Sequence, residues 1–279
     1  MSNHLFVAAD VGNARIKLGL FEETVPEPLR TLPLLEGKIF QFDRITPWLA
    51  DIAQESFCWR IASVNRPATT WLIDWLREHR PADRVTLLAA DDLPLKVRLP
   101  RPDMVGIDRL VDAVAVNRLR RPGQPAAIVD VGTAITVDLV SAEGVFLGGA
   151  ILPGIEMSAR ALLQFTDLLP LVDTSDLESP PPPVGIDTVS AIQSGLYWGA
   201  VGAIRELVQR QCETASGAGW GGSSTATPTR STATPTPVFL TGGAGAAVAD
   251  LLGPAACYVP NLTLAGIALA VKTSATGPQ

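Results

Sequence analysis

Three turns that each follow an apolar run carry residue types suited to holding phosphate. The first is Asp10-Val11-Gly12-Asn13, with Lys17 shortly after it. Backbone N–H groups of a glycine-containing turn can approach phosphate oxygens closely, because glycine has no side chain in the way. The Asp10 carboxylate can hold a divalent ion directly or through water, and Lys17 can neutralise phosphate charge. The alternative is an ordinary hairpin in which Asp10 caps its own turn.

The first pattern returns later in the chain as Asp130-Val131-Gly132-Thr133-Ala134, now with hydroxyl groups at Thr133 and Thr136. The third turn, Thr241-Gly242-Gly243, leads from a predicted strand into a predicted helix, whose N-terminus favours anions. The structural alternative for the second turn is a plain hairpin, and that for the third is a glycine pair that only allows close packing. If the second turn faces the first, it would close a phosphate cleft from the other side. The occurrence of all three turns in this order, each after an apolar run, argues against coincidence.

The block Gly106-Ile107-Asp108-Arg109 opens a predicted helix over residues 108–119. The Asp108 carboxylate can accept a proton from a substrate hydroxyl, and the Arg109 guanidinium can grip a carboxylate with two hydrogen bonds. The alternative is a helix cap beside a solvated arginine.

Apolar runs and the spacing of apolar residues indicate the elements that must position these groups. Leu5–Ala9 and Arg15–Phe21 predict two strands around a tight turn, in which Gly12 and Asn13 suit positive φ. The same strand–turn–strand pattern recurs from Ala126 to Val140, which indicates two similar units in tandem. Helical spacing occurs over Ile45–Glu55, Thr69–His79 and Asp108–Leu119, and we expect Trp48, Trp71 and Trp75 to fill the core.

The composition excludes several classes of protein. Of 279 residues, 47% are hydrophobic and 18% are charged, so the chain as a whole is not disordered. The net charge of −6 argues against binding nucleic acid. Residues 215–237 are rich in Gly, Ser, Thr and Pro, and we expect a low-complexity surface insertion there.

Further features of the sequence indicate a cytoplasmic protein without a membrane segment. The three cysteines, Cys58, Cys212 and Cys257, form no C-x-x-C pair, so neither a disulfide framework nor a cysteine zinc site is expected. We see no signal peptide at the N-terminus. The longest apolar stretch, Leu262–Val271, is shorter than the ~18–20 residues that span a bilayer.

Taken together, the motifs resemble those of type III pantothenate kinases, a family of the acetate kinase, sugar kinase, Hsp70 and actin superfamily. The matching blocks, in family order, are residues 10–17, 106–109, 130–138, 148–154, 185–188 and 191–195. The resemblance implies an α/β fold of two tandem ribonuclease-H-like domains with an ATP cleft between them. We assign these domains to residues 1–117 and 118–279, with the insertion 215–237 in the second.

The resemblance also implies an activity: ATP-dependent phosphorylation of the primary hydroxyl of pantothenate, the first step of coenzyme A biosynthesis. The residues implied to contact ATP are Asp10, Val11, Gly12, Asn13, Ala14, Arg15, Ile16, Lys17 and Thr133. Those implied to line the pantothenate site are Gly106, Ile107, Asp108, Arg109 and Thr188.

The same resemblance assigns particular roles. Asp108 is the proton acceptor, Asp130 helps hold a monovalent cation, K⁺ or NH₄⁺, and Asp10 is placed near Mg²⁺ or another divalent ion, through phosphate or water. The family is dimeric, so a homodimer with substrate near the subunit interface is implied. Relatives often carry a tyrosine where we align Leu99 or its neighbour, so packing over pantothenate can differ here.

Two other functions are compatible with the motifs. One is a different kinase or phosphatase of the superfamily, acting on a sugar, acetate or polyphosphate. The other is a non-catalytic regulator, because some relatives are accessory factors for gene expression. The presence of both Asp108 and Asp130 favours an enzyme, since a retired site would be free to lose them.

Overall fold

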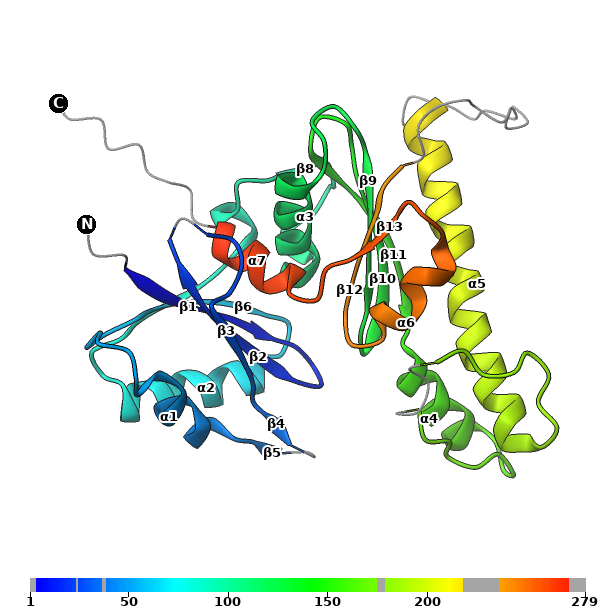
Figure 1. Ribbon diagram of the computed structural model, residues 1–279, viewed down its shortest axis with the longest axis horizontal. Coiled ribbons are helices and arrows are strands. Elements are labelled where there is room, and N and C mark those ends of the chain that lie inside the picture. The colour runs from blue at the N-terminus through cyan, green and yellow to red at the C-terminus, as the bar shows by residue number, and fades with distance from the viewer. Residues whose placement is uncertain (1–3, 24, 37–38, 175–178, 218–235, 271–279) are drawn as a thin grey trace. The chain divides into compact units, whose positions relative to one another are not determined.

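The computed structural model describes residues 4–23, 25–36, 39–174, 179–217 and 236–270. The chain forms two compact units, one of Met1–Arg118 with Asn261–Gln279 and one of Leu119–Pro260. Each unit contains a sheet with both parallel and antiparallel strands, and helices pack against it (Figure 1). The α/β fold class expected from the sequence is therefore confirmed.

The sheet of the first unit has the strand order β3-β2-β1-β6-β7. Its strands are β1 (Leu5–Val11), β2 (Ile16–Glu22), β3 (Arg30–Pro33), β6 (Cys58–Ser63) and β7 (Arg84–Leu87). β1 pairs antiparallel with β2 and parallel with β6, so its carboxyl end lies beside the start of β2 and the end of β6. This arrangement brings two loops to the same edge of the sheet.

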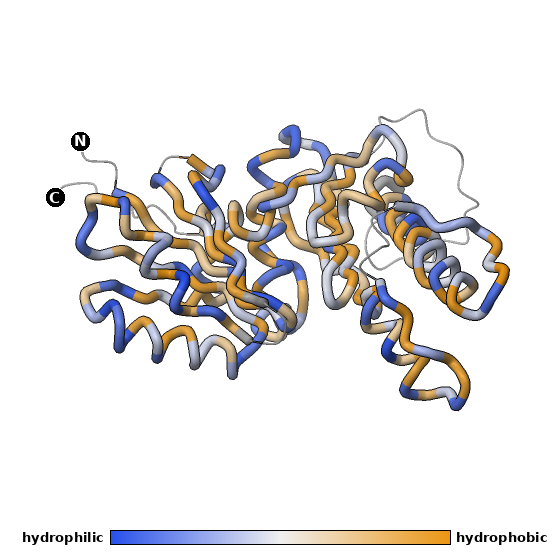
Figure 2. The backbone as a smooth tube through the Cα atoms, turned by 60° about the horizontal axis from the view of Figure 1, so that its bottom comes forward, coloured by the Kyte–Doolittle hydropathy of each residue, from blue (hydrophilic) through white to orange (hydrophobic). Residues whose placement is uncertain are grey.

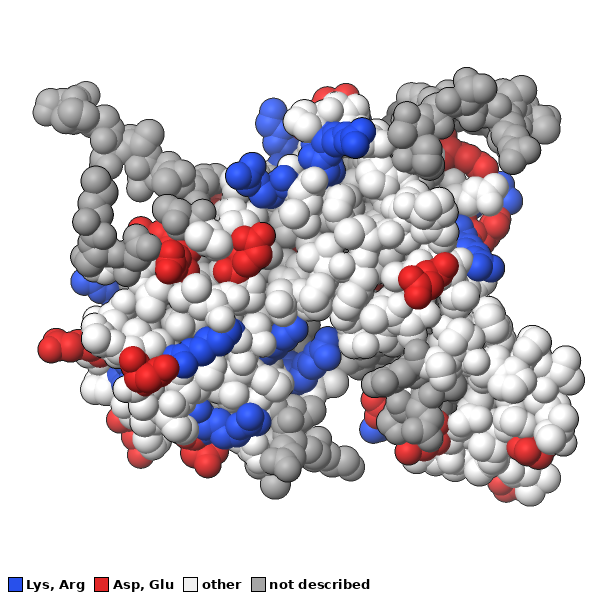
Figure 3. Space-filling view, in the orientation of Figure 1, with Lys and Arg blue, Asp and Glu red and all other residues white. Residues whose placement is uncertain are grey.

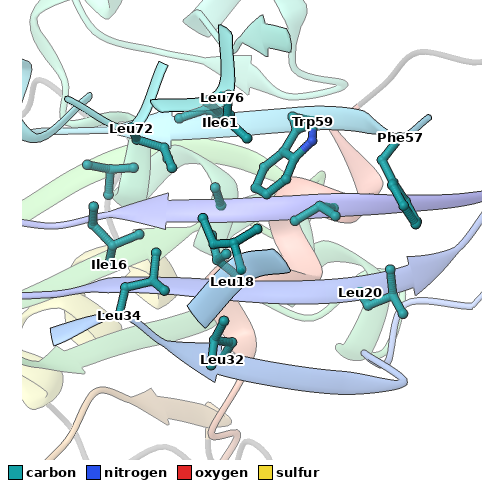
Figure 4. Packing of buried hydrophobic residues seen from close by; sticks show 14 of the residues in the cluster. Ile16, Leu18, Leu20, Leu32, Leu34, Phe57, Trp59, Ile61, Leu72 and Leu76 are labelled. Carbon is teal, nitrogen blue, oxygen red and sulfur yellow. The ribbon is translucent and has the colours of Figure 1, made fainter. Parts of the chain in front are cut away.

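One face of this sheet is covered by α1 (Ile45–Leu49) and α2 (Arg66–His79). Alternate residues of β2, Ile16, Leu18 and Leu20, point into the core that these helices close, as the period of two in a strand requires (Figure 4). From α2 the core receives Leu72 and Leu76, which are four residues apart on one helical face. Burial of these apolar side chains supplies the main driving force that holds the unit together.

The other face of the first sheet carries α7 (Leu262–Leu269), which packs on β1, β2 and β6. The Arg60 guanidinium donates a hydrogen bond of 2.6 Å to the Ala268 carbonyl at the end of this helix. Gly266 lies so close to α3 (Ile107–Leu119) that an added Cβ would overlap the Val111 carbonyl. The compact units therefore differ from the predicted division into residues 1–117 and 118–279, because residues 261–270 complete the first unit.

In the second unit the strands follow the order β13-β12-β9-β10-β11. They are β9 (Ala126–Val131), β10 (Ala134–Val140), β11 (Val145–Pro153), β12 (Val238–Thr241) and β13 (Ala256–Tyr258). The helices are α4 (Ile155–Phe165), α5 (Thr188–Gly217) and α6 (Gly245–Ala249). Buried residues of α5 and α6, such as Tyr197 and Val248, pack against Val129 and Val137 of the sheet. Figure 2 shows the apolar residues concentrated along the strands.

The remaining elements are short. They are the strands β4 (Leu35–Glu36), β5 (Ile39–Phe40) and β8 (Lys96–Val97), and 3-10 turns at Phe42–Arg44, Ala90–Asp92, Pro102–Met104 and Asp250–Leu252. No helix in the described part of the chain combines the length and the apolar character that crossing a bilayer requires. Of the predicted insertion 215–237, residues 218–235 lie outside the described residues.

Three local predictions are wrong. The helix expected over Ile45–Glu55 ends at Leu49, because the Gln54 side chain exchanges hydrogen bonds with the backbone of Leu5. Trp71 is 56% exposed, since α2 turns Leu72 rather than Trp71 towards the sheet. Neither Gly12 nor Asn13 has a positive φ; a hydrogen bond of 3.0 Å from Gly12 N to Arg15 O closes their turn instead.

Candidate active site

The first group of candidate residues lies at the turn between β1 and β2. Asp10 is directly opposite Lys17 in the antiparallel register, and both side chains are half-buried. Burial lowers the pKa of the Lys17 amine, and the charge of Arg15 lowers it further, whereas the Asp10 carboxylate acts in the opposite direction. The turn therefore presents a cation beside a carboxylate at one end of the sheet.

The remaining residues of this turn divide between core and surface. Val11 and Ile16 are buried and anchor the two strands, whereas Asn13, Ala14 and Arg15 are exposed at the tip, and Gly12 is half-buried. An added Cβ at Gly12 would lie 3.3 Å from the Arg15 carbonyl, so the closed turn is tight at this position. The exposed tip leaves its backbone accessible to a ligand.

The segment that follows β6 lies against this turn. The Val64 N–H donates to the Val11 carbonyl at 3.1 Å, which continues the parallel pairing beyond the end of β6. Asn65 is the N-cap of α2: its Oδ1 accepts from Ala68 N at 3.1 Å, and its Nδ2 lies 3.4 Å from the Gly12 carbonyl. Sequence reasoning missed Asn65, although Asn before Arg66-Pro67 is a helix-start signal.

Asp108 lies at the start of α3, near the same segment. Its Oδ1 accepts a hydrogen bond of 2.8 Å from the Arg109 backbone N–H. Burial raises the pKa of the Asp108 carboxyl, against the opposing hydrogen bond and charge of Arg109. A Cβ added at Gly106 would lie 2.5 Å from Asp108 Oδ1 and 3.7 Å from Val64 Cγ1, so a side chain at this position would displace the Asp108 carboxylate. The first unit thus brings Gly106–Arg109 beside the segment that touches the Asp10 turn.

A carboxylate with a raised pKa can serve as a proton acceptor. An acceptor is most effective when its pKa lies nearer the working pH, and burial moves Asp108 in that direction. Ile107 beside it is buried and anchors the helix, whereas Arg109 is half-buried. Asp108 can therefore take a proton, and Arg109 supplies a fixed positive charge next to it.

The second group of candidate residues lies in the second unit, where β9 and β12 end and β10 begins. Asp130 precedes the β9–β10 turn and is the parallel-register partner of Thr241 on β12. Gly242 has φ +89°, and a Cβ there would overlap Asp130 Oδ1 and lie 2.5 Å from the Val131 carbonyl. The Tyr258 hydroxyl donates to the Gly242 carbonyl at 3.2 Å and holds this loop from the other side.

Thr133 occupies the exposed tip of the β9–β10 turn. Its carbonyl accepts from Gly154 N at 3.0 Å, and Gly132 N donates to the Ala134 carbonyl at 3.1 Å. A Cβ at Gly154 would overlap the Gly132 and Thr133 carbonyls, so glycine permits the close approach of β11 to this turn. Asp130, Thr133 and the Gly242 loop therefore lie in one neighbourhood of the second unit.

Thr188 is the exposed first residue of α5. The preceding Asp187 caps this helix by accepting from Ser190 N at 2.8 Å, and this hydrogen bonding lowers the pKa of the Asp187 carboxyl. The nearby glycine, Gly185, has no room for a Cβ against the backbone of Ala191. The block 185–188 is thus a helix cap that presents Thr188 at the surface.

Within the described residues, the structure holds no group of three or more His, Cys, Asp or Glu side chains placed to bind a metal ion. Asp10 and Asp130 each supply one carboxylate at the end of a strand. A cation at either position would take its other ligands from backbone carbonyls, water or a bound phosphate.

Comparison with known proteins decides the family. The model of the type III pantothenate kinase family matches residues 6–210. The chain belongs to the type III pantothenate kinase family. The matched span includes the Asp10 turn, Asp108, Asp130 and Thr188. The family resemblance and the enzyme class expected from the sequence are thereby confirmed.

Several type III pantothenate kinases are similar to the chain. That of Rhodopirellula baltica is 43% identical over 161 residues, 56% of this chain and only 58% of that protein's length. That of Dehalococcoides mccartyi strain CBDB1 is 35% identical over 209 residues, covering 73% and 78% of the two chains. That of Agathobacter rectalis is 26% identical over 279 residues, covering 96% and 97%.

A solved structure supports the fold. A putative 2-dehydro-3-deoxygalactonokinase from Sinorhizobium meliloti superposes with a TM-score of 0.51 and 14% identity, covering 95% of this chain and 97% of that one. Both units of this type III pantothenate kinase family member carry the mixed sheet and helices of a ribonuclease-H-like domain, as the sequence predicted.

Proposed function

We propose that this chain transfers the γ-phosphoryl group of ATP to the primary hydroxyl of pantothenate, the first step of coenzyme A biosynthesis. The observation that carries the proposal is Asp108: a carboxyl with a burial-raised pKa beside Gly106, which itself lies close to Val64 of the segment that pairs with the Asp10 turn. Membership of the type III pantothenate kinase family supports the choice of substrate.

In this proposal Asp108 is the general base. Its Oδ1 already accepts the Arg109 N–H, so we assign the substrate hydroxyl to Oδ2. As the hydroxyl oxygen attacks the γ-phosphorus, its proton passes to Asp108, the bond to the β-phosphate oxygen breaks, and ADP leaves. The Arg109 side chain, half-buried beside the base, is the group that we assign to the pantothenate carboxylate. Thr188 is proposed as a further pantothenate contact.

The nucleotide contacts follow from charge and accessible backbone. Phosphoryl transfer depends on positioning and on neutralising phosphate charge. The exposed backbone at Asn13–Arg15 and the Lys17 amine provide both in the first unit, and Thr133 offers a hydroxyl at an exposed turn in the second. A Mg²⁺ ion fits Asp10 as one carboxylate ligand, because Mg²⁺ commonly keeps water and phosphate as its other ligands. There it would neutralise phosphate charge.

A monovalent cation is proposed at Asp130. The Asp130 carboxylate lies close to the Gly242 loop and to the Val131 carbonyl, and oxygen donors of this kind can replace the hydration shell of K⁺. An ion there would balance negative charge close to Thr133. NH₄⁺ would be held by the same acceptors through its N–H donors.

A homodimer is also part of the proposal. The second unit exposes a run of large apolar side chains on and after α4, beside the exposed Glu156–Arg160 ion pair of that helix, and uncharged surface predominates over this unit in Figure 3. The apolar side chains are Met157, Leu163, Phe165, Leu168 and Leu171. Such a surface is typical of an interface rather than of a solvated helix.

A cytoplasmic location stays a prediction.

The test is identification of the product. The purified chain is incubated with ATP, Mg²⁺ and pantothenate, with K⁺ or Na⁺ as the only monovalent cation, and the product is identified by mass spectrometry. Glucose, acetate and polyphosphate serve as alternative substrates. The proposal expects phosphopantothenate, formed faster with K⁺ than with Na⁺. Turnover of another acceptor in the panel, with none of pantothenate, would contradict it.

A further inference from the structure

The short segment Val64–Asn65 contacts both parts of the candidate site in the first unit. On one side it meets the Asp10 turn through backbone and side-chain hydrogen bonds. On the other side Val64 Cγ1 lies 3.7 Å from the place where Gly106 would carry a Cβ, beside the Asp108 carboxylate. Its position after β6 is therefore suited to setting the geometry of the turn.

Two consecutive peptide groups of the turn are held by two consecutive residues of this segment. Val64 N–H binds the Val11 carbonyl at 3.1 Å, and Asn65 Nδ2 lies 3.4 Å from the Gly12 carbonyl. A trans peptide is planar, so its N–H points opposite to its carbonyl. Fixing the Gly12 carbonyl towards Asn65 therefore directs the Asn13 N–H away from Asn65, at the exposed tip of the turn.

The orientation of the Asn65 amide is itself determined by its surroundings. The Ala68 N–H donates to the Asn65 side chain over 3.1 Å and requires an acceptor there. Asn65 Oδ1 therefore faces the helix, and Asn65 Nδ2 must face Gly12. The Asn65 carbonyl accepts from Thr69 Oγ1 at 2.8 Å, and Asn65 N donates to Ser63 Oγ at 3.1 Å. These bonds fix the Asn65 backbone, from which the side chain extends.

We propose that Asn65 is a positioning residue for the nucleotide: through the Gly12 carbonyl it holds the Asn13 N–H in the orientation that binds a phosphate oxygen. Capping of α2 is then only half of its role. This inference rests on the proposed function, because it takes the Asp10 turn to be the site of the ATP phosphates.

Serine at position 65 separates the two roles. Ser is a good N-cap and can still accept from Ala68 N, but it has no amide to reach the Gly12 carbonyl. We expect Asn65→Ser to keep the melting temperature and to raise the KM for ATP about 3- to 10-fold, the effect of losing one ordinary hydrogen bond. The KM for pantothenate should stay within about twofold, because the backbone contacts of Val64 are unchanged.

Two further variants complete the experiment. Asn65→Ala removes both the cap and the amide, so it should lower the melting temperature by about 2–4 °C and raise the KM for ATP as Ser does. The control is Asp83→Asn, which weakens bonds to Phe57 N and Trp59 Nε1 at the opposite end of β6. It should lower the melting temperature and leave both KM values unchanged.

Each outcome supports or overturns the positioning role of Asn65. A wild-type KM for ATP in Asn65→Ser would overturn the inference and leave Asn65 as a helix cap. An equal rise in the KM for ATP in Asp83→Asn would also overturn it, since loss of stability would then explain the effect. If the wild-type chain does not turn over pantothenate, the proposed function fails. Calorimetric titration of the same variants with Mg-ATP then still tests Asn65.

Discussion

Asp10 and Lys17 face each other directly across the β1–β2 hairpin. One further residue pair, Val11 and Ile16, separates them from the turn with the exposed tip. Burial lowers the pKa of Lys17 and the neighbouring Asp10 carboxylate counteracts this, so the pair keeps a cation in a half-buried place. In the proposed kinase that cation meets the phosphates of ATP.

Replacing Lys17 should weaken nucleotide binding. We expect Lys17→Met to reduce the affinity for Mg-ATP about 10- to 100-fold, the range for losing a charged hydrogen bond. Because the pKa of Lys17 lies below its ordinary 10.5, the wild-type affinity should fall as pH rises towards that value, and the variant should be insensitive. Calorimetry between pH 7 and pH 10 measures both effects. Lys96→Met, at an exposed lysine, is the control, and a pH-independent wild-type affinity would argue against this role of Lys17.

The position of Gly242 can be tested against another glycine with the same φ. Gly242 and Gly253 both have φ +89°, but a Cβ overlaps Asp130 only at Gly242, whereas at Gly253 it meets no atom within 4 Å. Each alanine variant should lose about 1–3 kcal/mol of folding stability from the positive φ, and Gly242→Ala should lose more than Gly253→Ala because its Cβ also meets the Val131 carbonyl. Only Gly242→Ala should also lose the stimulation of turnover by K⁺, measured as the ratio of rates in K⁺ and Na⁺. Equal ratios in the two variants would remove Asp130 from the proposed cation site.

The raised pKa of Asp108 predicts a dependence of stability on pH. A carboxyl whose pKa is raised by folding binds its proton more tightly in the native state, so its contribution is fully present below the unfolded value of 3.8. That contribution is lost as pH rises through the native pKa. The free energy of unfolding of Asp108→Asn minus that of the wild type should therefore be larger at pH 7 than at pH 4. Urea unfolding of both proteins at the two pH values measures this difference. A difference that is independent of pH would mean that the pKa of Asp108 is not raised.

The local structure around the site was largely predictable from the sequence. The apolar runs Leu5–Ala9 and Ala126–Val129, each followed by Asp-Val-Gly, predicted both hairpins and their carboxylates. The helix start at Asp108 was also predicted to within one residue. These features depend on short-range periodicity and turn chemistry, which a single sequence displays.

Contacts between distant residues were not predictable. The hydrogen bond from Asn65 to Gly12 joins residues 53 apart, and that from Arg60 to Ala268 joins residues 208 apart. No local pattern marks the packing of α7 on the first sheet, so residues 261–270 were assigned to the wrong side of the predicted division. Tyr258 was missed for the same reason, since its hydroxyl matters only through the Gly242 carbonyl.

The central claim is that Asp108 accepts the proton of the pantothenate hydroxyl, and turnover by Asp108→Asn tests it most directly. Asparagine keeps the size of the side chain and an oxygen for the Arg109 N–H, but it is not a base. With saturating ATP and pantothenate, we expect kcat to fall about 10²- to 10⁴-fold while calorimetric affinity for Mg-ATP is unchanged. Asp103→Asn, at an exposed carboxylate of the same unit, should turn over normally. Near-normal turnover by Asp108→Asn would contradict the account.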